Sequence, residues 1–405
     1  MTGFHISSDE EIKSGKTTDI YFDRTEKILD SEGLSDKKVT VEVTASSLPE
    51  EWPWAVISGL DEVAELFEGV PVDVEAVPEG TIFSPYDSSG VRVPLIKIKG
   101  AYRDFCSLET PMLGMLCHSS GVSTKSARVR KVAGDKNVLA FGIRRMHPAI
   151  APMLDRAAFI GGADSVSSIA GAEEIGQDPL GTMPHALMIM MGDQVKAWKS
   201  FDEVVSEEVP RIALADTYSD EKEEVIRAAE ALKDRLDGVR LDTPSSRRGN
   251  FPELIREVRW ELDIRGFEDV GIVVSGGLDE YSIPQLIEAG ADSFGVGTSV
   301  TNAPVLNLAM DIVEVEGKFA AKRGKLSGEK DVWRCKVCSE TMVSLSSDGK
   351  PECSKCGGET EDMFEPLVED GELVREFSEP EEIRERVISQ LENFEMEESF
   401  PSTFD

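Results

Sequence analysis

The segment LDTPSSRRGN, which runs from Leu241 to Asn250, combines an aspartate, three hydroxyl side chains and two adjacent arginines within ten residues. The chain around it is acidic, with 77 Asp and Glu residues against 43 Lys and Arg residues. Carboxylates suit sugar hydroxyls or divalent cations, and arginines suit phosphates and carboxylates. The segment therefore indicates a site for a polyanion that carries hydroxyl groups.

A regular alternation of apolar runs and helical patterns surrounds this segment. The runs cover residues 137–142, 164–168, 211–216, 238–242, 271–277 and 293–299. Continuous apolar strands that alternate with amphipathic helices are typical of parallel βα units. Six such units within residues 136–310 favour a barrel over an open sheet. In a barrel, we expect the chemistry at the C-terminal ends of the strands.

Arginines follow two of these runs. Arg144 and Arg145 follow the first run, and Arg247 and Arg248 follow the run at 238–242. Surface salt bridges are the alternative explanation for each of them. In an acidic chain, arginines on glycine-flanked loops at strand ends favour contact with an anion. Since adjacent residues of a helix or strand point in different directions, we expect only one of Arg247 and Arg248 to face the ligand.

Two of the runs end in aspartate, at Asp216 and Asp242. Either residue could cap the helix that follows it. Ser219 or Asp220 is better placed to cap the helix after Asp216, which leaves Asp216 for function. Two strand-end carboxylates beside a phosphate site would suit Mg²⁺ or ribose hydroxyls.

The last two runs end in glycine-rich turns, SGG and GVGTS. Glycines can simply terminate strands, but they also let backbone N–H groups approach a phosphate closely. Two consecutive turns of this kind after late barrel strands favour a phosphate site, formed by Ser275, Gly276, Gly277, Gly295, Gly297 and Thr298. His185, at the start of the helix in GTMPHAL, is a stronger candidate for a catalytic histidine than His147, although a lone histidine is often structural.

Four cysteines near the C-terminus form two CxxC pairs, Cys335 with Cys338 and Cys353 with Cys356. This spacing suits a tetrahedral Zn²⁺ ion, and four protein ligands would make the site structural. A redox disulfide is the alternative.

Zinc ribbons often bind nucleic acid, so a different class of function is a ribbon interaction module. The local cations are few, Arg334, Lys336 and Lys355, and an acidic stretch follows.

The formal net charge of −34 is spread along the chain rather than collected in one tail. It argues against general binding to DNA, RNA or anionic lipid, which require a positive field. Sparse lysine also suggests adaptation to a salt-rich cytoplasm. The sequence has no 18-residue apolar run and no secretory signal pattern at its start, so we expect a cytoplasmic protein without a membrane span.

Seven ordered motifs together resemble the nicotinate phosphoribosyltransferase family in its shorter archaeal or bacterial form. They are TDIYFDRT, FGIRRMHP, GTMPHAL, ADTYSD, RLDTPSSRRGN, SGGLDE and FGVGTSV, within roughly residues 15–320. The related quinolinate-using family usually has a shorter chain and lacks the TDxYF start. The resemblance implies an α/β domain over residues 1–130 and an irregular α/β phosphoribosyl-binding barrel over 131–310. A C-terminal segment, 311–405, would return strands to the first domain and carry the zinc knuckle at about 333–358 and a terminal helix.

The resemblance also implies roles for individual residues. Tyr21 matches a tyrosine that reaches a neighbouring subunit's pocket, so we expect a homodimer or larger homo-oligomer with shared sites. Phe141 matches the aromatic residue that stacks on the pyridine ring, and His185 matches a histidine that some relatives phosphorylate from ATP. The remaining matched or candidate residues would hold ribose, pyrophosphate and base: Arg144, Arg145, Thr182, Asp216, Arg240, Asp242, Ser246, Arg247 and Arg248.

The implied activity is phosphoribosyl transfer from phosphoribosyl pyrophosphate to nicotinate, with pyrophosphate leaving as a Mg²⁺ complex. Two departures bear on ATP coupling. Relatives usually read RxDSGD where this chain reads RLDTPSSRRG, and often AHS where it reads PHAL. Quinolinate and nicotinamide remain alternative acceptors. Asp164 lies where nicotinamide-using relatives place an amide-reading aspartate, so it does not by itself exclude nicotinamide.

Overall fold

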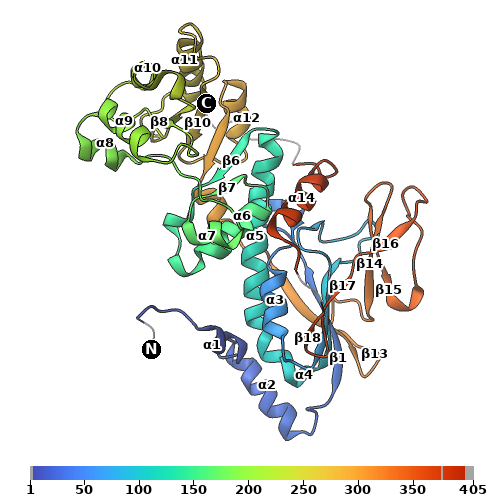
Figure 1. The fold of residues 1–405 in the computed structure, drawn as a ribbon. Coiled ribbons are helices and arrows are strands. Elements are labelled where there is room, and N and C mark those ends of the chain that lie inside the picture. The colour runs from blue at the N-terminus through green and yellow to red at the C-terminus, as the bar shows by residue number, and fades with distance from the viewer. Residues whose placement is uncertain (1–2, 375–376, 397–405) are drawn as a thin grey trace. The chain divides into compact units, whose positions relative to one another are not determined.

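The computed structural model describes residues 3–374 and 377–396, which form two compact units. The first unit contains the chain up to Thr124 and resumes at Pro304, and the second unit runs from Lys125 to Ala303. Figure 1 labels many of the helices and strands of both units. We describe each unit separately.

A seven-stranded antiparallel sheet forms the centre of the first unit, in the order β13-β12-β1-β5-β3-β17-β18. Strands from the two ends of the chain alternate within it, because β12 pairs with β1 and β17 pairs with β3. The predicted return of C-terminal strands to the N-terminal domain is therefore confirmed. The strands are β1 (Lys38–Ala45), β3 (Val72–Ala76), β5 (Pro94–Ala101), β12 (Leu308–Val315), β13 (Lys318–Phe319), β17 (Glu365–Glu369) and β18 (Glu372–Leu373).

The two faces of this sheet differ in chemistry. On β1, Val41 and Val43 are fully buried in the apolar core of the unit, together with Phe67 and Met112 from helices. The opposite face carries buried polar side chains such as Glu42. The first unit also contains the strand pair β2 (Ala55–Val56) and β4 (Ile82–Phe83), and the helices α1 (Asp9–Lys13), α2 (Ile20–Ser31), α3 (Leu60–Phe67), α4 (Tyr102–Phe105), the start of α5 (Glu109–Ala133) and α14 (Pro380–Leu391).

A small three-stranded sheet carries the cysteine-rich segment. It consists of β14 (Lys330–Cys335), β15 (Thr341–Leu345) and β16 (Thr360–Asp362), in the order β15-β14-β16. The base of β14 is fixed to the polar face of the large sheet by buried ion pairs. Lys330 Nζ lies 2.9 Å from Glu42, and Lys97 Nζ lies 2.8 Å from Asp331. These pairs hold the small sheet in the first unit.

The second unit contains six parallel strands in the order β7-β6-β11-β10-β9-β8. They match the six apolar runs of the sequence: β6 (Asn137–Ala140), β7 (Ser165–Val166), β8 (Ile212–Leu214), β9 (Gly238–Leu241), β10 (Gly271–Ser275) and β11 (Ser293–Val296). The irregular α/β barrel is confirmed. Its irregularity lies at β7 and β8, which share no ladder in the described part of the chain.

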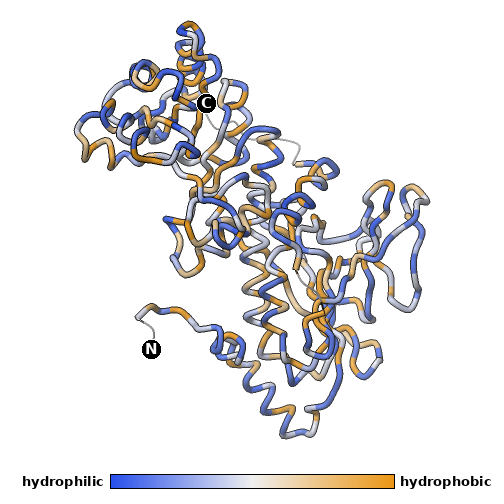
Figure 2. The backbone as a smooth tube through the Cα atoms, viewed as in Figure 1, coloured by the Kyte–Doolittle hydropathy of each residue, from blue (hydrophilic) through white to orange (hydrophobic). Residues whose placement is uncertain are grey.

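Helices connect these strands, as parallel pairing requires. They are α6 (Ala151–Ile160), α7 (Ile169–Glu174), α8 (His185–Met191), α9 (Gln194–Val204), α10 (Glu221–Leu232), α11 (Phe251–Asp263), α12 (Ile283–Glu288) and α13 (Thr298–Thr301). In Figure 2, hydrophilic and hydrophobic turns alternate along several of them, as one-sided burial requires. Among the described residues, no helix combines the length and apolarity that a membrane crossing needs.

One segment of the second unit is divided between two helices. Residues 184–201, PHALMIMMGDQVKAWKSF, are apolar and polar at helical spacing throughout, but they fall in α8 and the first part of α9. Gly192 adopts the left-handed conformation, with φ of 66°, and ends α8. Asp193 then caps α9 by accepting a hydrogen bond from the Lys196 N–H. The break positions His185 at the first turn of a short, separate helix.

Candidate active site

A cavity of about 390 Å³ lies at the C-terminal ends of the barrel strands. Twelve of the predicted residues line it: Phe141, Arg144, Arg145, Thr182, Arg240, Asp242, Ser275, Gly276, Gly277, Gly295, Gly297 and Thr298. Thr182 comes from the segment between α7 and α8, and the others come from β6, β9, β10, β11 and the loops that follow these strands. The barrel therefore gathers side chains that are far apart in sequence into one site.

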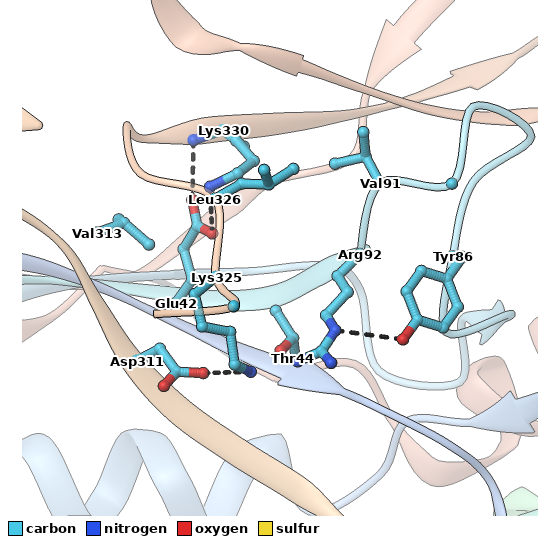
Figure 3. Close-up of a pocket in the computed structure, with 12 residues that line it drawn as sticks. Glu42, Thr44, Tyr86, Val91, Arg92, Asp311, Val313, Lys325, Leu326 and Lys330 are labelled. Carbon is cyan, nitrogen blue, oxygen red and sulfur yellow. Dashed lines mark hydrogen bonds and ion pairs between the residues drawn. The ribbon is translucent and has the colours of Figure 1, made fainter. Parts of the chain in front are cut away.

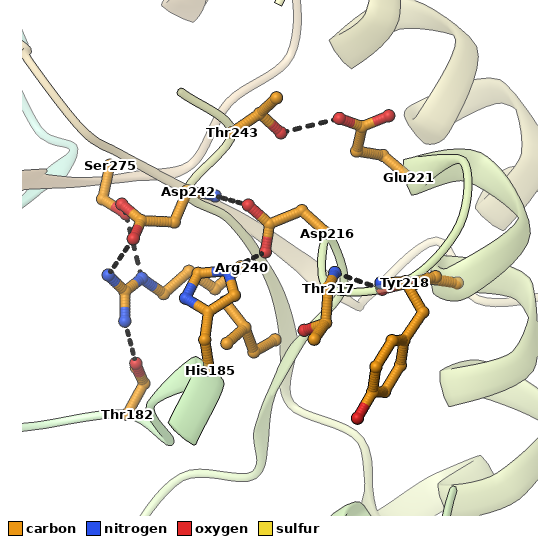
Figure 4. A network of polar contacts seen from close by, with 12 residues as sticks. Thr182, His185, Asp216, Thr217, Tyr218, Glu221, Arg240, Asp242, Thr243 and Ser275 are labelled. Atoms are coloured by element: carbon orange, nitrogen blue, oxygen red, sulfur yellow. Dashed lines mark hydrogen bonds and ion pairs between the residues drawn. The ribbon is translucent and has the colours of Figure 1, made fainter. Parts of the chain in front are cut away.

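Arg240, on β9, is the centre of a polar network in this cavity (Figure 4). Its Nε donates to Ser275 Oγ at 2.9 Å and its Nη1 donates to Thr182 Oγ1 at 2.7 Å. Its Nη2 lies 3.2 Å from Asp242 Oδ2, while Asp242 Oδ1 accepts from Ser275 Oγ at 2.7 Å. The guanidinium carbon lies 5.6 Å from the centre of the Phe141 ring. These contacts fix the cation and the carboxylate in one orientation.

Asp216 lies just after β8, beside Asp242 (Figure 4). Its Oδ2 accepts the Asp242 backbone N–H at 3.0 Å, and its Oδ1 lies 3.0 Å from His185 Nε2. Asp216 caps no helix, because Asp220 caps α10 as expected. Burial raises the pKa of the Asp216 carboxyl; His185 opposes this shift and the charge of Asp242 adds to it. Asp216 thus joins the histidine to the main chain of the cavity wall.

Two glycines are required by the close packing of this wall. Gly276 has a φ of 91°, and a Cβ there would lie 2.8 Å from the Arg248 guanidinium. A Cβ at Gly295 would lie 2.7 Å from the Phe141 ring. Side chains at these positions would therefore displace Arg248 or Phe141. The remaining glycines of the predicted phosphate cradle also line the cavity, which agrees with the close approach of backbone N–H groups to an anion.

Arg144 and Arg145 lie on a short 3-10 helix, Ile143–Arg145, that follows β6. Both are exposed, and within residues 3–374 and 377–396 neither forms an ion pair. In a chain with a net charge of −34, two unpaired arginines on a cavity wall are unusual. Their guanidinium groups are available to an anionic ligand.

The loop after β9 separates the two arginines that the sequence could not distinguish. Arg248 is half-buried and donates from Nε to the Thr243 carbonyl at 2.6 Å and from Nη2 to the Ser275 carbonyl at 3.0 Å. It thereby ties this loop to the end of β10. Arg247 and Ser246 are exposed, and neither lines the cavity. Contact of these three residues with ligand stays a prediction.

Asp164 lies at the opposite end of the strands from the cavity. Its Oδ2 accepts the Val138 backbone N–H at 2.7 Å, and it pairs with Arg130 at 3.1 Å. Val138 is near the start of β6, whereas the cavity lies beyond the end of β6. Asp164 is therefore a structural carboxylate, and its position gives no support to nicotinamide as the acceptor.

Sequence reasoning missed the buried residue Glu224, on α10. Its carboxylate accepts backbone N–H groups of Thr217, Tyr218 and Ser219 at 2.6–2.8 Å. It fixes the loop that follows Asp216. A glutamate in the first turn of a helix looks like an ordinary surface residue, so the sequence carries no signal for this role. Three residues that line the cavity were also missed: Ile143, Ser167 and Gly181.

Tyr21 and the cysteines belong to the first unit. Tyr21 lies on α2, is 55% exposed, and has its ring 4.3 Å from that of Phe22. Its role in a neighbouring subunit stays a prediction. The sulfur atoms of Cys335, Cys338, Cys353 and Cys356 all lie within 4.8 Å of one another, so this cluster could hold a metal ion.

The cations beside this cysteine cluster are already paired. Arg334 donates from Nη1 to Gln390 at 2.7 Å and from Nη2 to the Ile82 carbonyl at 2.8 Å. Lys336 lies 3.3 Å from Glu359, and Lys355 lies 3.7 Å from Glu340. A nucleic-acid surface would need unpaired cations here. This arrangement disfavours the ribbon interaction module.

Two family models match the chain in sequence order. The quinolinate phosphoribosyl transferase N-terminal domain matches residues 19–120, and the C-terminal domain of the same family matches residues 122–311. Nicotinate phosphoribosyltransferase pncB2 of Mycobacterium tuberculosis is 32% identical over 65% of this chain and 57% of its own length. Nicotinate phosphoribosyltransferase of Bacillus subtilis is 28% identical over 74% of this chain and 66% of its own length. The chain thus spans less than two thirds of these relatives.

Solved structures extend the similarity to nearly the whole chain. The crystal structure of nicotinate-nucleotide pyrophosphorylase from Pyrococcus furiosus is 54% identical, with a TM-score of 0.93 over 97% of this chain and 99% of that one. Human nicotinic acid phosphoribosyltransferase shares the fold, with a TM-score of 0.72 over 93% of this chain at 19% identity.

Proposed function

We propose that the chain, which belongs to the quinolinate phosphoribosyl transferase family and is similar to nicotinate phosphoribosyltransferases, transfers the phosphoribosyl group of phosphoribosyl pyrophosphate to nicotinate. The products are nicotinate mononucleotide and pyrophosphate, a reaction of NAD salvage. The observation that carries this proposal is the cavity in which Phe141, Arg240 and Asp242 meet two glycine-rich turns. It offers an aromatic surface, a fixed cation, a fixed carboxylate and backbone N–H donors to one ligand.

The cavity matches the parts of the two substrates. The 5′-phosphate fits the turns at Gly276–Gly277 and Gly297–Thr298, where N–H groups can donate to its oxygens. The pyridine ring fits against Phe141. The exposed guanidinium groups of Arg144 and Arg145 suit the carboxylate and pyrophosphate charges. Asp242 suits the ribose hydroxyls, because both of its oxygens are held in place by protein donors.

In the proposed reaction, the pyridine nitrogen of nicotinate forms a bond to C1′ of the ribose. The bond between C1′ and the pyrophosphate oxygen breaks, and its electron pair leaves with pyrophosphate. The nitrogen lone pair is already nucleophilic, so no general base is required. Catalysis then consists of positioning and charge stabilisation. The Asp242 carboxylate lies where it can stabilise positive charge on the ribose, and the arginines stabilise the leaving group.

Magnesium would enter with the donor. All four carboxylate oxygens of Asp216 and Asp242 already contact protein groups, namely His185, the Asp242 N–H, Ser275 and Arg240. These residues therefore fit a Mg²⁺ ion bound to pyrophosphate better than an ion held directly by protein carboxylates. The ion would neutralise charge on the leaving group.

His185 is the proposed site of any coupling to ATP. If Nε2–H donates to Asp216, the second ring nitrogen, Nδ1, keeps its lone pair. The side chain is 38% exposed, so a phosphate donor can reach it. Asp216 would then orient the ring and stabilise positive charge on it, as carboxylates do for catalytic histidines.

Zinc is the proposed occupant of the cysteine cluster. Four thiolates at about 2.3 Å from a tetrahedral ion lie about 3.8 Å apart. The Sγ atoms of Cys335 and Cys356 are 3.5 Å apart, and those of Cys338 and Cys353 are 3.6 Å apart. The geometry is thus close to that of a zinc site, and four protein ligands leave no open position for catalysis.

We also propose that two copies of the chain share active sites through Tyr21. The observation behind this proposal is an exposed aromatic ring at the position that the family motif marks. Mixing two impaired variants, Tyr21→Ala and Asp242→Asn, tests it. If sites are shared, mixed dimers contain one site with both residues intact and regain activity. If each chain forms its own site, mixing restores nothing.

The acceptor is tested directly. The purified protein is incubated with phosphoribosyl pyrophosphate and Mg²⁺, and nicotinate, nicotinamide and quinolinate are offered separately, with and without ATP. We expect nicotinate to be the only one of the three acceptors that yields pyrophosphate and a mononucleotide. Product from quinolinate with release of CO₂, or from nicotinamide, would replace the proposed acceptor. The Asp242→Asn variant controls for contaminating activity.

A further inference from the structure

A second cavity, of about 300 Å³, lies on the polar face of the seven-stranded sheet in the first unit (Figure 3). Strands β1 and β12 form its floor, and the loops at residues 86–92 and 324–330 form its walls. No residue of the proposed active site lines it. Its volume lies at the lower end of the range for small-molecule sites, which begins at about 300 Å³.

The walls of this cavity are held in place by specific hydrogen bonds. Asp87 Oδ1 accepts the backbone N–H groups of Ser89 and Val91 at 3.0 and 2.9 Å. Asp87 Oδ2 accepts the N–H of Val343 at 3.0 Å, which ties the loop to β15. On the other wall, Lys330 donates to the Gly328 carbonyl at 2.7 Å. The cavity is therefore formed in advance of any ligand.

The charges that line the cavity leave one cation without a carboxylate partner. Lys330 pairs with Glu42 at 2.9 Å, and Lys325 shares Asp311 with Lys322 at 2.5 and 2.6 Å, so both lysines that line the cavity have a carboxylate partner in the wall (Figure 3). Arg92 is the fifth charged residue. Its Nε donates to Tyr86 Oη at 3.3 Å, and in the part of the chain that the structure describes it has no ion pair.

The rest of the lining is apolar, apart from one unsatisfied hydroxyl. Val91, Val313 and Leu326 contribute aliphatic surface, and Tyr86 contributes a ring. Thr44 also lines the cavity; it is 6% exposed, and its Oγ1 has no hydrogen-bond partner among the described residues. A buried hydroxyl without a partner is costly, and a bound molecule in the cavity would explain it.

We propose that this cavity binds a small organic monoanion, namely a carboxylate with an apolar body. The carboxylate would pair with Arg92, and its body would lie against Val91, Val313 and Leu326. A single unpaired cation matches a single negative charge. A phosphate dianion fits less well, because it needs hydrogen-bond donors around all its oxygens, whereas Val91, Val313 and Leu326 line much of the cavity with aliphatic surface. This site is independent of the proposed transferase activity.

Methyl NMR of the full-length protein separates this cavity from the active site. In protein labelled at Ile, Leu and Val methyl groups, Val91, Val313 and Leu326 report on the second cavity. Ile143 reports on the active-site cavity. Benzoate serves as the carboxylate probe and inorganic phosphate as the charge-only probe. Both are titrated at constant ionic strength into the wild type and the variants Arg92→Gln, Thr44→Val and Arg103→Gln.

We expect benzoate to shift the Val91, Val313 and Leu326 resonances saturably, and Arg92→Gln to weaken this binding roughly tenfold or more. Arg103→Gln is the matched control, because it removes the same charge from an exposed pair with Asp30 elsewhere in the unit. The proposal is overturned if benzoate leaves these resonances unchanged, or if both glutamine variants bind it as the wild type does. It is also overturned if phosphate saturates the cavity and benzoate does not. Thr44→Val is expected to alter benzoate affinity without disturbing Ile143.

Discussion

His185 Nε2 lies 3.0 Å from Asp216 Oδ1, and the other oxygen of Asp216 accepts the Asp242 backbone N–H. One carboxylate therefore links a ring at the start of α8 with the strand end that carries Asp242. Asp216 is 1% exposed, so its two hydrogen bonds are shielded from solvent. Its position makes it an orienting residue for both neighbours.

The first prediction follows from this link. Asp216→Asn keeps the shape of the side chain but replaces one acceptor oxygen with an NH₂ group. The amide can then accept only one of the two hydrogen bonds that the carboxylate accepts. We expect turnover with nicotinate to fall by about two to three orders of magnitude, with unchanged circular dichroism. Asp234→Asn, an exposed position in the same unit, is the control. Turnover within a few-fold of the wild type would exclude an active-site role for Asp216.

The second prediction concerns Arg240, whose guanidinium reaches Ser275, Thr182 and Asp242 at once. Lysine keeps the charge but cannot span three partners, since it lacks the planar fork. We expect Arg240→Lys to lower kcat/KM for phosphoribosyl pyrophosphate by about a hundredfold. Arg256→Lys, in an exposed pair with Glu253, should leave it unchanged. Equal kcat/KM values for the two variants would show that Arg240 has no role in binding or turnover of this substrate.

Much of this architecture could be predicted because strand ends in a parallel barrel converge. Asp242 and Gly276 each follow or end an apolar run. This position was enough to predict that both line the same cavity, without knowledge of side-chain packing. The strand order and the pairing of β12 with β1 were less accessible, because they join segments more than 250 residues apart. The sequence predicted that the C-terminal segment returns strands to the first unit, but it carried neither the bounds of β12 nor its register.

Contacts made by long side chains could not be predicted in the same way. Arg247 and Arg248 are adjacent and chemically identical, and only the fold shows that Arg248 reaches the Ser275 carbonyl. Asp164 follows a helix and precedes a strand, so it lies at the wrong end of the barrel for the role that the motif suggested. Glu224 is buried by tertiary packing that its surface-like sequence context conceals.

The third prediction tests Glu224. Glu224→Ala would leave the N–H groups of Thr217, Tyr218 and Ser219 without their acceptor, so we expect a loss of about 2–4 kcal/mol in the free energy of unfolding. Urea denaturation measures this change. At urea concentrations below the unfolding transition, turnover should also be lower than in the wild type, because the loop after Asp216 is released. Glu223→Gln, one residue earlier and exposed, is the control. A stability equal to that of the control would show that water replaces the carboxylate.

The fourth prediction is a pH dependence of stability. Burial, with a further contribution from Asp311, raises the pKa of Glu109 to about 7, against an ordinary value of 4.5. The folded protein thus keeps a proton that the unfolded chain releases, so this residue lowers stability as the pH rises from about 4.5 to 7. Glu109→Gln removes the cost of ionisation. We expect it to stabilise the protein by about 1–3 kcal/mol at pH 8 and by much less at pH 4.

The measurement for Glu109 is chemical denaturation at a series of pH values. Glu10→Gln, at an exposed position on α1, controls for the loss of one negative charge from an acidic chain. If Glu109→Gln and Glu10→Gln give parallel pH profiles, general charge repulsion explains the gain and the Glu109 site does not.

The fifth prediction concerns the cysteine cluster, which lies at one end of a three-stranded sheet with little apolar core of its own. Its buried apolar cluster consists of Trp333, Met342 and two of the cysteines. So small a core cannot hold the fold alone, which makes a bound metal the main source of local stability. We expect one zinc ion per chain, and we expect chelation or Cys353→Ser to make the segment between β14 and β16 sensitive to protease. Cys117→Ser, a lone cysteine on α5, should leave both zinc content and cleavage unchanged. Protease resistance in metal-free protein would show instead that the ion pairs to the large sheet suffice.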